Sequence, residues 1–293
     1  MIDNRLNTFL VTAEVKNLTR ASEILNITQP AVSQHIKYLE EFYKVKLLCK
    51  NGKSMALTPE GEYLYSKAKE LNKISKLITN HLSNKNSFIK KYNLGASLTI
   101  GGYTLPTILG DHRKLNNNVD VILTVDNTHN ILKKLNSGDI ELAIIEGFFN
   151  KKEYLYRKFK DDELILVFSP EHNFSQKEYV SIEDLLNGNL ILREIGSGTR
   201  DLISYEINKI GCSFDKNNIY MEIGDIHAII SLVLSNVGYT IISKEVAKDY
   251  LSNGLLLTRE IIGLNLKREF NFVYTNNSDL NFINNFYDFC MKH

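Results

Sequence analysis

The 293-residue sequence has few cysteines and no long apolar run. Its three cysteines, Cys49, Cys212 and Cys290, are far apart and odd in number, which argues against a disulfide framework and a thiol metal site. No apolar segment approaches the roughly 20 residues that a membrane helix needs. The N-terminus, Met1–Arg5, lacks a signal-peptide pattern. These absences predict a cytoplasmic protein with no membrane partner.

The sequence also lacks recognisable catalytic and cofactor motifs. Its seven histidines form no His-x-x-x-His pair, and Gly196–Gly198 lacks the glycine spacing of a nucleophile elbow. Neither the Walker nor the Rossmann glycine pattern occurs. The acidic run Asp161–Glu163 is interpreted as a solvated turn. We therefore expect no catalytic residue, no cofactor and no bound metal.

Charge is distributed unevenly along the chain. Residues 1–90 carry 14 Lys and Arg against 8 Asp and Glu, whereas residues 91–293 carry 21 against 26. A basic first third joined to an acidic remainder suggests a nucleic-acid-binding module attached to a second function.

The basic segment has the pattern of a helix-turn-helix. Leu6–Val15 and Thr19–Leu25 predict two short helices, with Thr19 as a cap. Thr28 caps a third helix, which runs from Gln29 to about Tyr43. Two short helices joined by a tight turn form a helix-turn-helix, and the polar outer face of the second helix is typical of a helix that enters the major groove.

The third helix has a buried stripe and a polar face. Val32, Ile36 and Leu39 repeat at i, i+4 and i+7. Gln29, Ser33, Gln34 and Lys37 lie off this stripe. In the major groove, glutamine can pair with adenine, serine can bond either base type, and lysine can reach guanine or phosphate. The strands Val45–Leu48 and Met55–Leu57 then flank a basic turn and predict a wing.

A long helix follows, starting at Thr58-Pro59. Its apolar residues are spaced 4-3-4-3-4, the period of a coiled coil. The alternative is one apolar face packed on the same subunit; the length and narrowness of the seam favour a dimer contact. Asn84–Ser87 is the expected linker. The seam consists of Leu64, Ala68, Leu71, Ser75, Ile78 and Leu82.

From Tyr92 onward the pattern alternates between strands and helices, which predicts an α/β domain with mostly parallel sheets. Two strand groups suggest two lobes: lobe I at about 91–162 and 265–293, and lobe II at about 163–264. The expected strands are Tyr92–Ala96, Val119–Val125, Ile140–Ile145, Leu164–Phe168, Leu190–Arg193, Ile219–Glu222, Tyr239–Ile242 and Phe270–Tyr274.

Two segments have the chemistry of a small-anion site. Ser97–Gly102 and Gly196–Arg200 each follow a strand and bring hydroxyls and glycine-exposed N–H groups to a helix start. The alternative is simple helix capping. Gly147-Phe148 follows a third strand and is expected to line the same cleft. The residues expected around the ligand are Ser97, Thr99, Gly147, Phe148, Gly196, Ser197, Thr199 and Arg200.

With these motifs in view, the sequence resembles the LysR-type transcriptional regulators along its whole length. Leu18–Glu40 and Leu57–Gly61 carry the most specific part of the resemblance, and Gly95–Pro106 is similar to the opening of the family's effector domain. Arg193–Arg200 looks like the branch that regulates sulfite-reductase and carbon-fixation operons.

The resemblance implies an N-terminal all-α winged helix-turn-helix with a long linker helix, followed by a two-lobed effector domain like periplasmic binding proteins. It implies domains at 1–58, 59–90 and 91–293, and assembly as a homodimer or homotetramer. It also implies partners: a double-stranded DNA operator and a small anionic effector. The residues expected at the DNA come from the third helix and its cap and from the wing. They are Thr28, Gln29, Pro30, Ser33, Gln34 and Lys37 in the first group and Lys50 and Lys53 in the second.

The sequence departs from the family pattern at three places. Tyr43 stands where a glycine usually ends the recognition helix, Leu48 to Lys50 stand where Leu-Phe-x-Arg is usual, and Ser22 replaces a common alanine.

Two other functions remain as alternatives: a small-ligand-binding protein with a basic tail, and an enzyme with a DNA-binding appendage. For the effector, a sulfur oxyanion is the leading candidate from the resemblance, and a phosphorylated or carboxylate metabolite is the alternative. Activation and repression are left open.

Overall fold

The computed structural model describes residues 3–51, 54–85, 89–213, 219–276 and 278–293. The chain divides into two compact units, one of residues 1–86 with 136–139 and one of residues 87–135 with 140–293. Among the described residues, no helix combines the length and the apolar character needed to cross a membrane.

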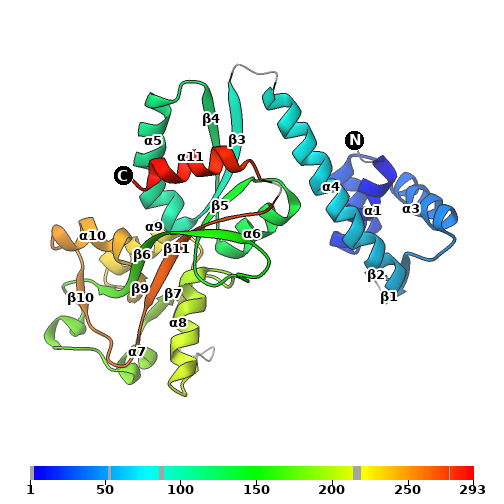
Figure 1. Cartoon of the computed structure of the whole chain (residues 1–293). Coiled ribbons are helices and arrows are strands. Elements are labelled where there is room, and N and C mark those ends of the chain that lie inside the picture. The colour runs from blue at the N-terminus through cyan, green and yellow to red at the C-terminus, as the bar shows by residue number, and fades with distance from the viewer. Residues whose placement is uncertain (1–2, 52–53, 86–88, 214–218, 277) are drawn as a thin grey trace. The chain divides into compact units, whose positions relative to one another are not determined.

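The first unit is a winged helix-turn-helix, in which three short helices precede a two-stranded antiparallel hairpin and a long helix (Figure 1). Its core forms where α1, α3 and α4 meet the hairpin, around Phe9, Ile36 and Leu47. Its elements are α1 (Asn4–Val15), α2 (Leu18–Leu25), α3 (Gln29–Tyr43), β1 (Leu48–Asn51), β2 (Ser54–Leu57) and α4 (Pro59–Lys85).

The helix boundaries follow from capping. Thr28 caps α3 as predicted, since its hydroxyl accepts from the Ala31 N–H. The cap of α2 is Asn17, whose side chain accepts from Arg20, and not Thr19 as predicted; Thr19 lies inside the first turn. The third helix ends at Tyr43, as predicted, and Lys44 after it, rather than Tyr43, takes the left-handed conformation with φ 56°.

Lys44 therefore occupies the position that favours glycine. A side chain in the left-handed region costs roughly 1–2 kcal/mol, and the greater freedom of glycine in the unfolded chain offsets part of this cost. We expect Lys44→Gly to raise the free energy of unfolding of the first unit by about 0.5–1 kcal/mol, measured by urea denaturation. Lys37→Gly, at an exposed site inside the same helix, should lower it by about 1 kcal/mol. Equal losses from both variants would show that Lys44 carries no strain.

The second unit is an α/β fold built on one nine-stranded sheet, in the order β4-β3-β5-β11-β6-β9-β7-β8, with β10 paired to β6. Its strands are β3 (Lys90–Ser97), β4 (Val119–Asp126), β5 (Leu142–Glu146), β6 (Leu155–Phe168), β7 (Leu190–Leu192), β8 (Met221–Glu222), β9 (Tyr239–Ser243), β10 (Leu257–Arg259) and β11 (Lys267–Tyr274). Its helices are η1 (Ile100–Thr104), α5 (Leu105–Leu115), α6 (Thr128–Ser137), η2 (Asn173–Gln176), α7 (Ile182–Asn187), α8 (Gly198–Lys209), α9 (Ile226–Leu234), α10 (Lys244–Ser252) and α11 (Leu280–Cys290).

The long strand β6 runs through both lobes of this unit (Figure 1). The first part of β6 pairs with β11, and its last residues pair with β9 and β10. These central pairs are antiparallel, whereas the outer pairs β3–β4, β3–β5, β7–β8 and β7–β9 are parallel. The expectation of mostly parallel sheets therefore holds only for the outer strands, because the chain crosses between the lobes on β6 and β11.

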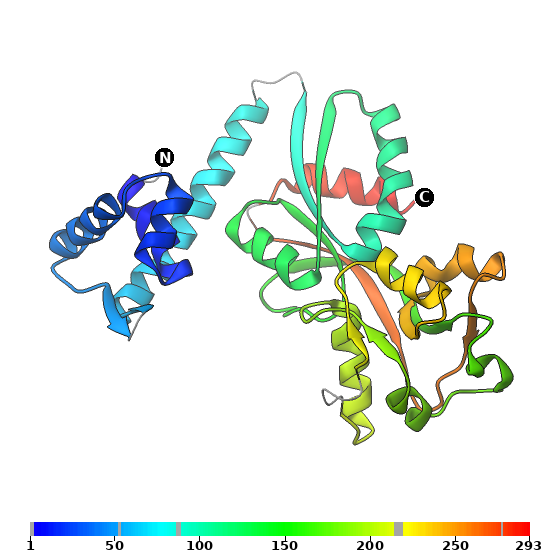
Figure 2. The ribbon, with the colours of Figure 1, turned by 180° about the vertical axis from the view of Figure 1, so that it is seen from behind.

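Each lobe has its own apolar core. In lobe I, α5 and α11 cover the sheet around Leu94, Phe272 and Phe286; Figure 2 shows α5 alongside β4. In lobe II, α7 and α8 cover one cluster around Leu190 and Ile203, and α9 and α10 cover another. The catalytic or binding chemistry of such a fold is expected at the carboxyl ends of the parallel strands.

Candidate functional site

The outer face of α3 is open to solvent. Thr28, Gln29, Pro30, Gln34 and Lys37 are exposed, and Ser33 is half-buried. The amide Nε2 of Gln29 donates to Ser33 Oγ at 3.0 Å, which holds both polar groups at the same place near the helix start. Val32, Ile36 and Leu39 are buried on the opposite side, as predicted. The helix therefore presents a polar surface that a nucleic acid can reach.

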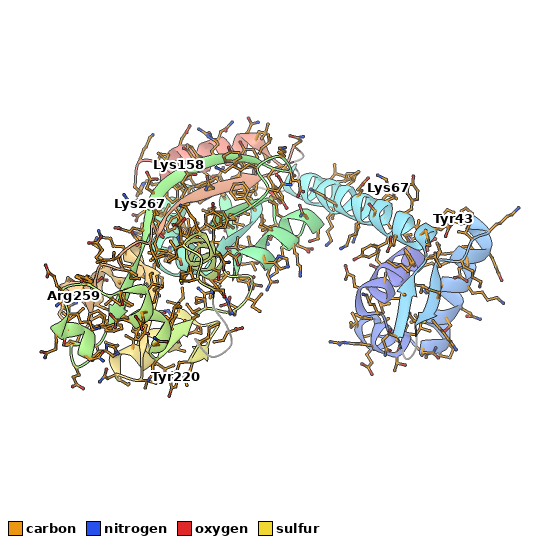
Figure 3. The ribbon with its side chains drawn as sticks, turned by 90° about the horizontal axis from the view of Figure 1, so that it is seen from below. Tyr43, Lys67, Lys158, Tyr220, Arg259 and Lys267 are labelled. Carbon is orange, nitrogen blue, oxygen red and sulfur yellow. The ribbon has the colours of Figure 1, made fainter. Side chains whose placement is uncertain are left out.

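The wing is attached to α3 through Glu40. Its carboxylate accepts from the backbone N–H groups of Leu47 and Leu48, at 2.9 and 3.3 Å, and from the Lys46 ammonium. Lys50, on β1, is exposed. The predicted wing residue Lys53 lies outside the described residues. Lys67 projects from α4 (Figure 3), and its ammonium lies 2.9 Å from Glu70 Oε1.

The seam of α4 falls into two parts. Ala68 is buried and Leu64 packs on the core of the first unit, as the alternative reading of this helix had it. Beyond them an apolar stripe is exposed, in which four side chains are 48–55% accessible; Ser75 beside it is half-buried. One member, Ile74, does not belong to the seam predicted from the sequence. The stripe consists of Leu71, Ile74, Ile78 and Leu82.

In the second unit, the hydroxyl-bearing helix starts are deeply buried. Ser97 is 1% exposed, and Thr99, Ser197 and Thr199 are each 2% exposed. Within the described residues, neither Thr99 nor Ser197 makes a side-chain capping hydrogen bond, although each precedes a helical segment. The Ser97 hydroxyl accepts instead from the Glu146 N–H at 3.4 Å. Simple helix capping therefore does not account for Thr99 and Ser197.

Glycines let the two lobes meet at this place. A Cβ on Gly147, at the end of β5, would lie 2.6 Å from Gly198 Cα at the start of α8, and Gly147 also has a φ of 95°. The Thr128 hydroxyl donates to the Glu146 carbonyl at 2.9 Å. Phe148 is exposed and packs edge-on against Tyr205 of α8, with ring centroids 5.3 Å apart. The structure thus brings Ser97, Thr99, Gly147, Ser197 and Thr199 to one junction.

Arg200 and Gly196 lie at the edge of this junction. The Arg200 guanidinium binds the Glu222 carboxylate and the Arg193 carbonyl, so its hydrogen-bonding capacity is partly used within lobe II. Gly196 is half-buried with a φ of 91°, and its carbonyl accepts from the His129 N–H at 3.2 Å.

A buried charge cluster that the sequence analysis missed lies at the same junction. Arg268 of β11 donates through Nε to Asp162 of β6 at 2.7 Å and through Nη1 to the Thr199 hydroxyl at 3.0 Å. Glu146 Oε1 is 3.9 Å from Arg268 Nη1. Ser243 donates to the other Asp162 oxygen at 2.6 Å. The three charged side chains are at most 4% exposed.

The prediction that Asp161–Glu163 forms a solvated turn was therefore wrong. These residues lie inside β6, and strand alternation turns Asp162 inward while Asp161 stays exposed and Glu163 half-exposed. The same alternation separates Lys267, which projects outward (Figure 3), from buried Arg268. One signal was present in the sequence: Arg268 and Asp162 are charged residues that adjoin apolar strand segments.

The cluster has unused hydrogen-bonding capacity. Among the described residues, Glu146 Oε2 and Arg268 Nη2 are buried without a hydrogen-bond partner. Complete burial raises the pKa of the Glu146 carboxyl, and the arginines Arg268 and Arg193 and the Thr99 hydroxyl act against this effect. Buried polar groups left unpaired are costly, so they mark a place where a water or a ligand binds.

The chain matches two family models. Residues 4–62 match the model described as "Bacterial regulatory helix-turn-helix protein, lysR family", and residues 87–293 match "LysR substrate binding domain". An uncharacterized HTH-type transcriptional regulator of Methanocaldococcus jannaschii, MJ0300, is 31% identical over 89% of this chain and 88% of its own. The HTH-type transcriptional regulator CysL of Bacillus subtilis is 28% identical over 92% and 90%.

Solved structures share the fold. The regulatory domain of CcmR from Synechocystis PCC6803, in complex with 2-PG, superposes with a TM-score of 0.62 at 22% identity, covering 69% of this chain and 96% of its own. Full-length CbnR complexed with its target DNA superposes with a TM-score of 0.62 at 17% identity, covering 100% and 99%. Within the described part of the chain, no group of three or more metal-ligating side chains is placed to hold an ion.

Proposed function

Because the chain belongs to the LysR family of transcriptional regulators, we propose that it binds operator DNA as a dimer of winged helices and that a small anion changes this binding. The observation that carries the proposal is the exposed polar start of α3, with Gln29 and Ser33 joined by a hydrogen bond. A glutamine at this place can present its amide to the donor and acceptor of adenine in the major groove.

Dimerisation through α4 follows from its exposed stripe. Four apolar side chains on one helix face, from Leu71 to Leu82, suit burial against a second copy of the helix. Residues 59–90 serve in this proposal as the dimerisation segment and hinge. Two linked recognition helices then reach two half-sites about one helical turn apart.

The proposed DNA contact is tested by two variants of the full chain on an operator selected from random-sequence DNA. Gln29→Ala should weaken binding to the selected site by roughly 1–3 kcal/mol and binding to random DNA by less, because base contacts specify. Lys50→Ala should weaken both alike and flatten the salt dependence by about one unit, because lysine at a wing binds phosphate. Fluorescence anisotropy measures both. If Gln29→Ala weakens binding to both DNAs equally, the Gln29 side chain contacts no base.

The effector site proposed here is the junction of Ser97, Thr99, Ser197, Thr199 and Arg268. It offers hydroxyls and a buried guanidinium, groups that suit a sulfur oxyanion, a phosphorylated metabolite or a carboxylate. The sulfur oxyanion remains the leading candidate, from the resemblance of Arg193–Arg200. An anion that bridges the lobes shifts the equilibrium between two lobe arrangements only by the difference between its affinities for them.

A further inference from the structure

The proposed effector site contains a carboxylate where an anion is expected to bind. Glu146 is 2% exposed and faces four groups: Arg268 on β11, Asp162 on β6, Arg193 at the end of β7, and the Thr99 hydroxyl. Arg268 already forms an ion pair with Asp162, and Arg193 with Glu194. Glu146 therefore has only a share in these positive charges, at 3.9 Å from Arg268 Nη1.

The two buried atoms of the cluster that have no hydrogen-bond partner among the described residues have opposite roles, since one is a donor and the other is an oxygen of a carboxyl group. Arg268 Nη2 is a donor, and within the described residues it has no acceptor; Glu146 Oε2 has no partner either. An oxyanion oxygen satisfies Arg268 directly. Two oxygens that meet in a buried space, one from the ligand and one from Glu146, repel each other unless a proton lies between them.

We propose that this site selects oxyanions that still carry a hydrogen, and that Glu146 is the residue that enforces the choice. Hydrogen phosphate, hydrogen sulfite or an acid with an adjacent hydroxyl brings the proton that Glu146 Oε2 accepts. Sulfate carries none near neutral pH, so it binds only after Glu146 takes up a proton from solvent. The inference rests on the proposed function, since it specifies the ligand class of that site.

Phosphate and sulfate are the sharpest probes, because both are tetrahedral and similar in size and differ in the proton. In calorimetric titrations of the full chain between about pH 8 and pH 10, inorganic phosphate should reach at least a tenfold lower Kd than sulfate once Glu146, whose pKa is raised by burial, is ionised. The sulfate Kd should fall as pH is lowered, because Glu146 becomes protonated and donates to the anion. Glu146→Gln should bring the two Kd values within about threefold, because the glutamine amide donates to sulfate.

A matched variant controls for a general change of charge. Glu163 follows Asp162 on β6, but its carboxylate is half-exposed and paired with Lys244. Glu163→Gln should therefore leave the preference for phosphate intact. The comparison of phosphate with sulfate on the unaltered chain also keeps the test valid if Glu146→Gln fails to fold.

The outcomes distinguish failure of the selectivity from failure of the anionic effector site. Sulfate binding as tightly as phosphate at every pH between about 8 and 10 would overturn the selectivity and leave an anionic effector standing. Binding of sulfite or 2-PG without any binding of phosphate would also overturn it, since phosphate satisfies the stated chemistry. If none of these anions binds, both the inference and the anionic effector are rejected.

Discussion

Replacing Leu71 with aspartate is expected to convert the proposed dimer to monomers and to lower operator affinity by about a hundredfold or more. Leu71 is 54% exposed at the start of the apolar stripe on α4. A carboxylate at this position would lose its water when a second copy of the helix packs against the stripe, which disfavours association. Linkage of two DNA-binding modules contributes a factor of roughly 10²–10⁴, which the monomer loses. Sedimentation velocity and anisotropy on the selected operator measure the two effects.

Ser66→Asp provides the matched control. Ser66 is exposed on the same helix, about a third of a turn away from the stripe, so it adds the same charge outside the expected contact. It should leave sedimentation and operator affinity unchanged. A folded Leu71→Asp variant that sediments like the unaltered chain would show that the stripe is not the main contact between copies.

Replacing Arg268 with methionine is expected to lower the free energy of unfolding of the second unit by about 3–5 kcal/mol. The substitution keeps most of the side-chain volume but leaves Asp162 and Glu146 as buried carboxyls without their cation. Removing one partner of a buried ion pair costs this much because the other charge stays desolvated. Chemical denaturation of the full chain, followed by far-ultraviolet circular dichroism, measures the loss.

A surface arginine supplies the comparison. Arg157, also on the β6–β11 ladder, is 3.9 Å from Asp288 and is partly exposed, so Arg157→Met should cost less than about 1 kcal/mol. Adding Asp162→Asn to Arg268→Met should recover part of the stability, because the stranded charge is removed. Similar small losses from both arginine variants would mean that the Arg268 cluster is hydrated and adds little to the fold.

Local patterns were sufficient to predict the winged helix and the outer strands. The i, i+4, i+7 stripe of α3 and the apolar runs of β3, β5 and β9 each encode their element within one segment. The strand β6 was recognised only at its apolar end, Leu164–Phe168. Its first nine residues are mostly charged, because that stretch is half-exposed and is held in the sheet by pairing with β11, a partner over 100 residues away.

The candidate site was predicted in part for the same reason. Ser97, Thr99, Ser197 and Thr199 stand at helix starts, which a sequence reveals through glycines and hydroxyls next to strand ends. Arg268 and Asp162 are brought together by the register of β11 on β6, which neither segment encodes alone. Glu146 was overlooked because a single acidic residue after a strand has no periodicity, and only the fold shows that it is fully buried.

The most direct test of the account is whether DNA and an anion affect each other's binding. Calorimetry with sulfite, inorganic phosphate and 2-PG is performed on the full chain, alone and saturated with the selected operator. The account predicts that the operator changes the Kd of at least one anion, by a factor in the range of about 5–150. The same anion must change the operator Kd by the same factor, because binding linkage is reciprocal. Anion affinities that are identical with and without operator would contradict the proposed regulation.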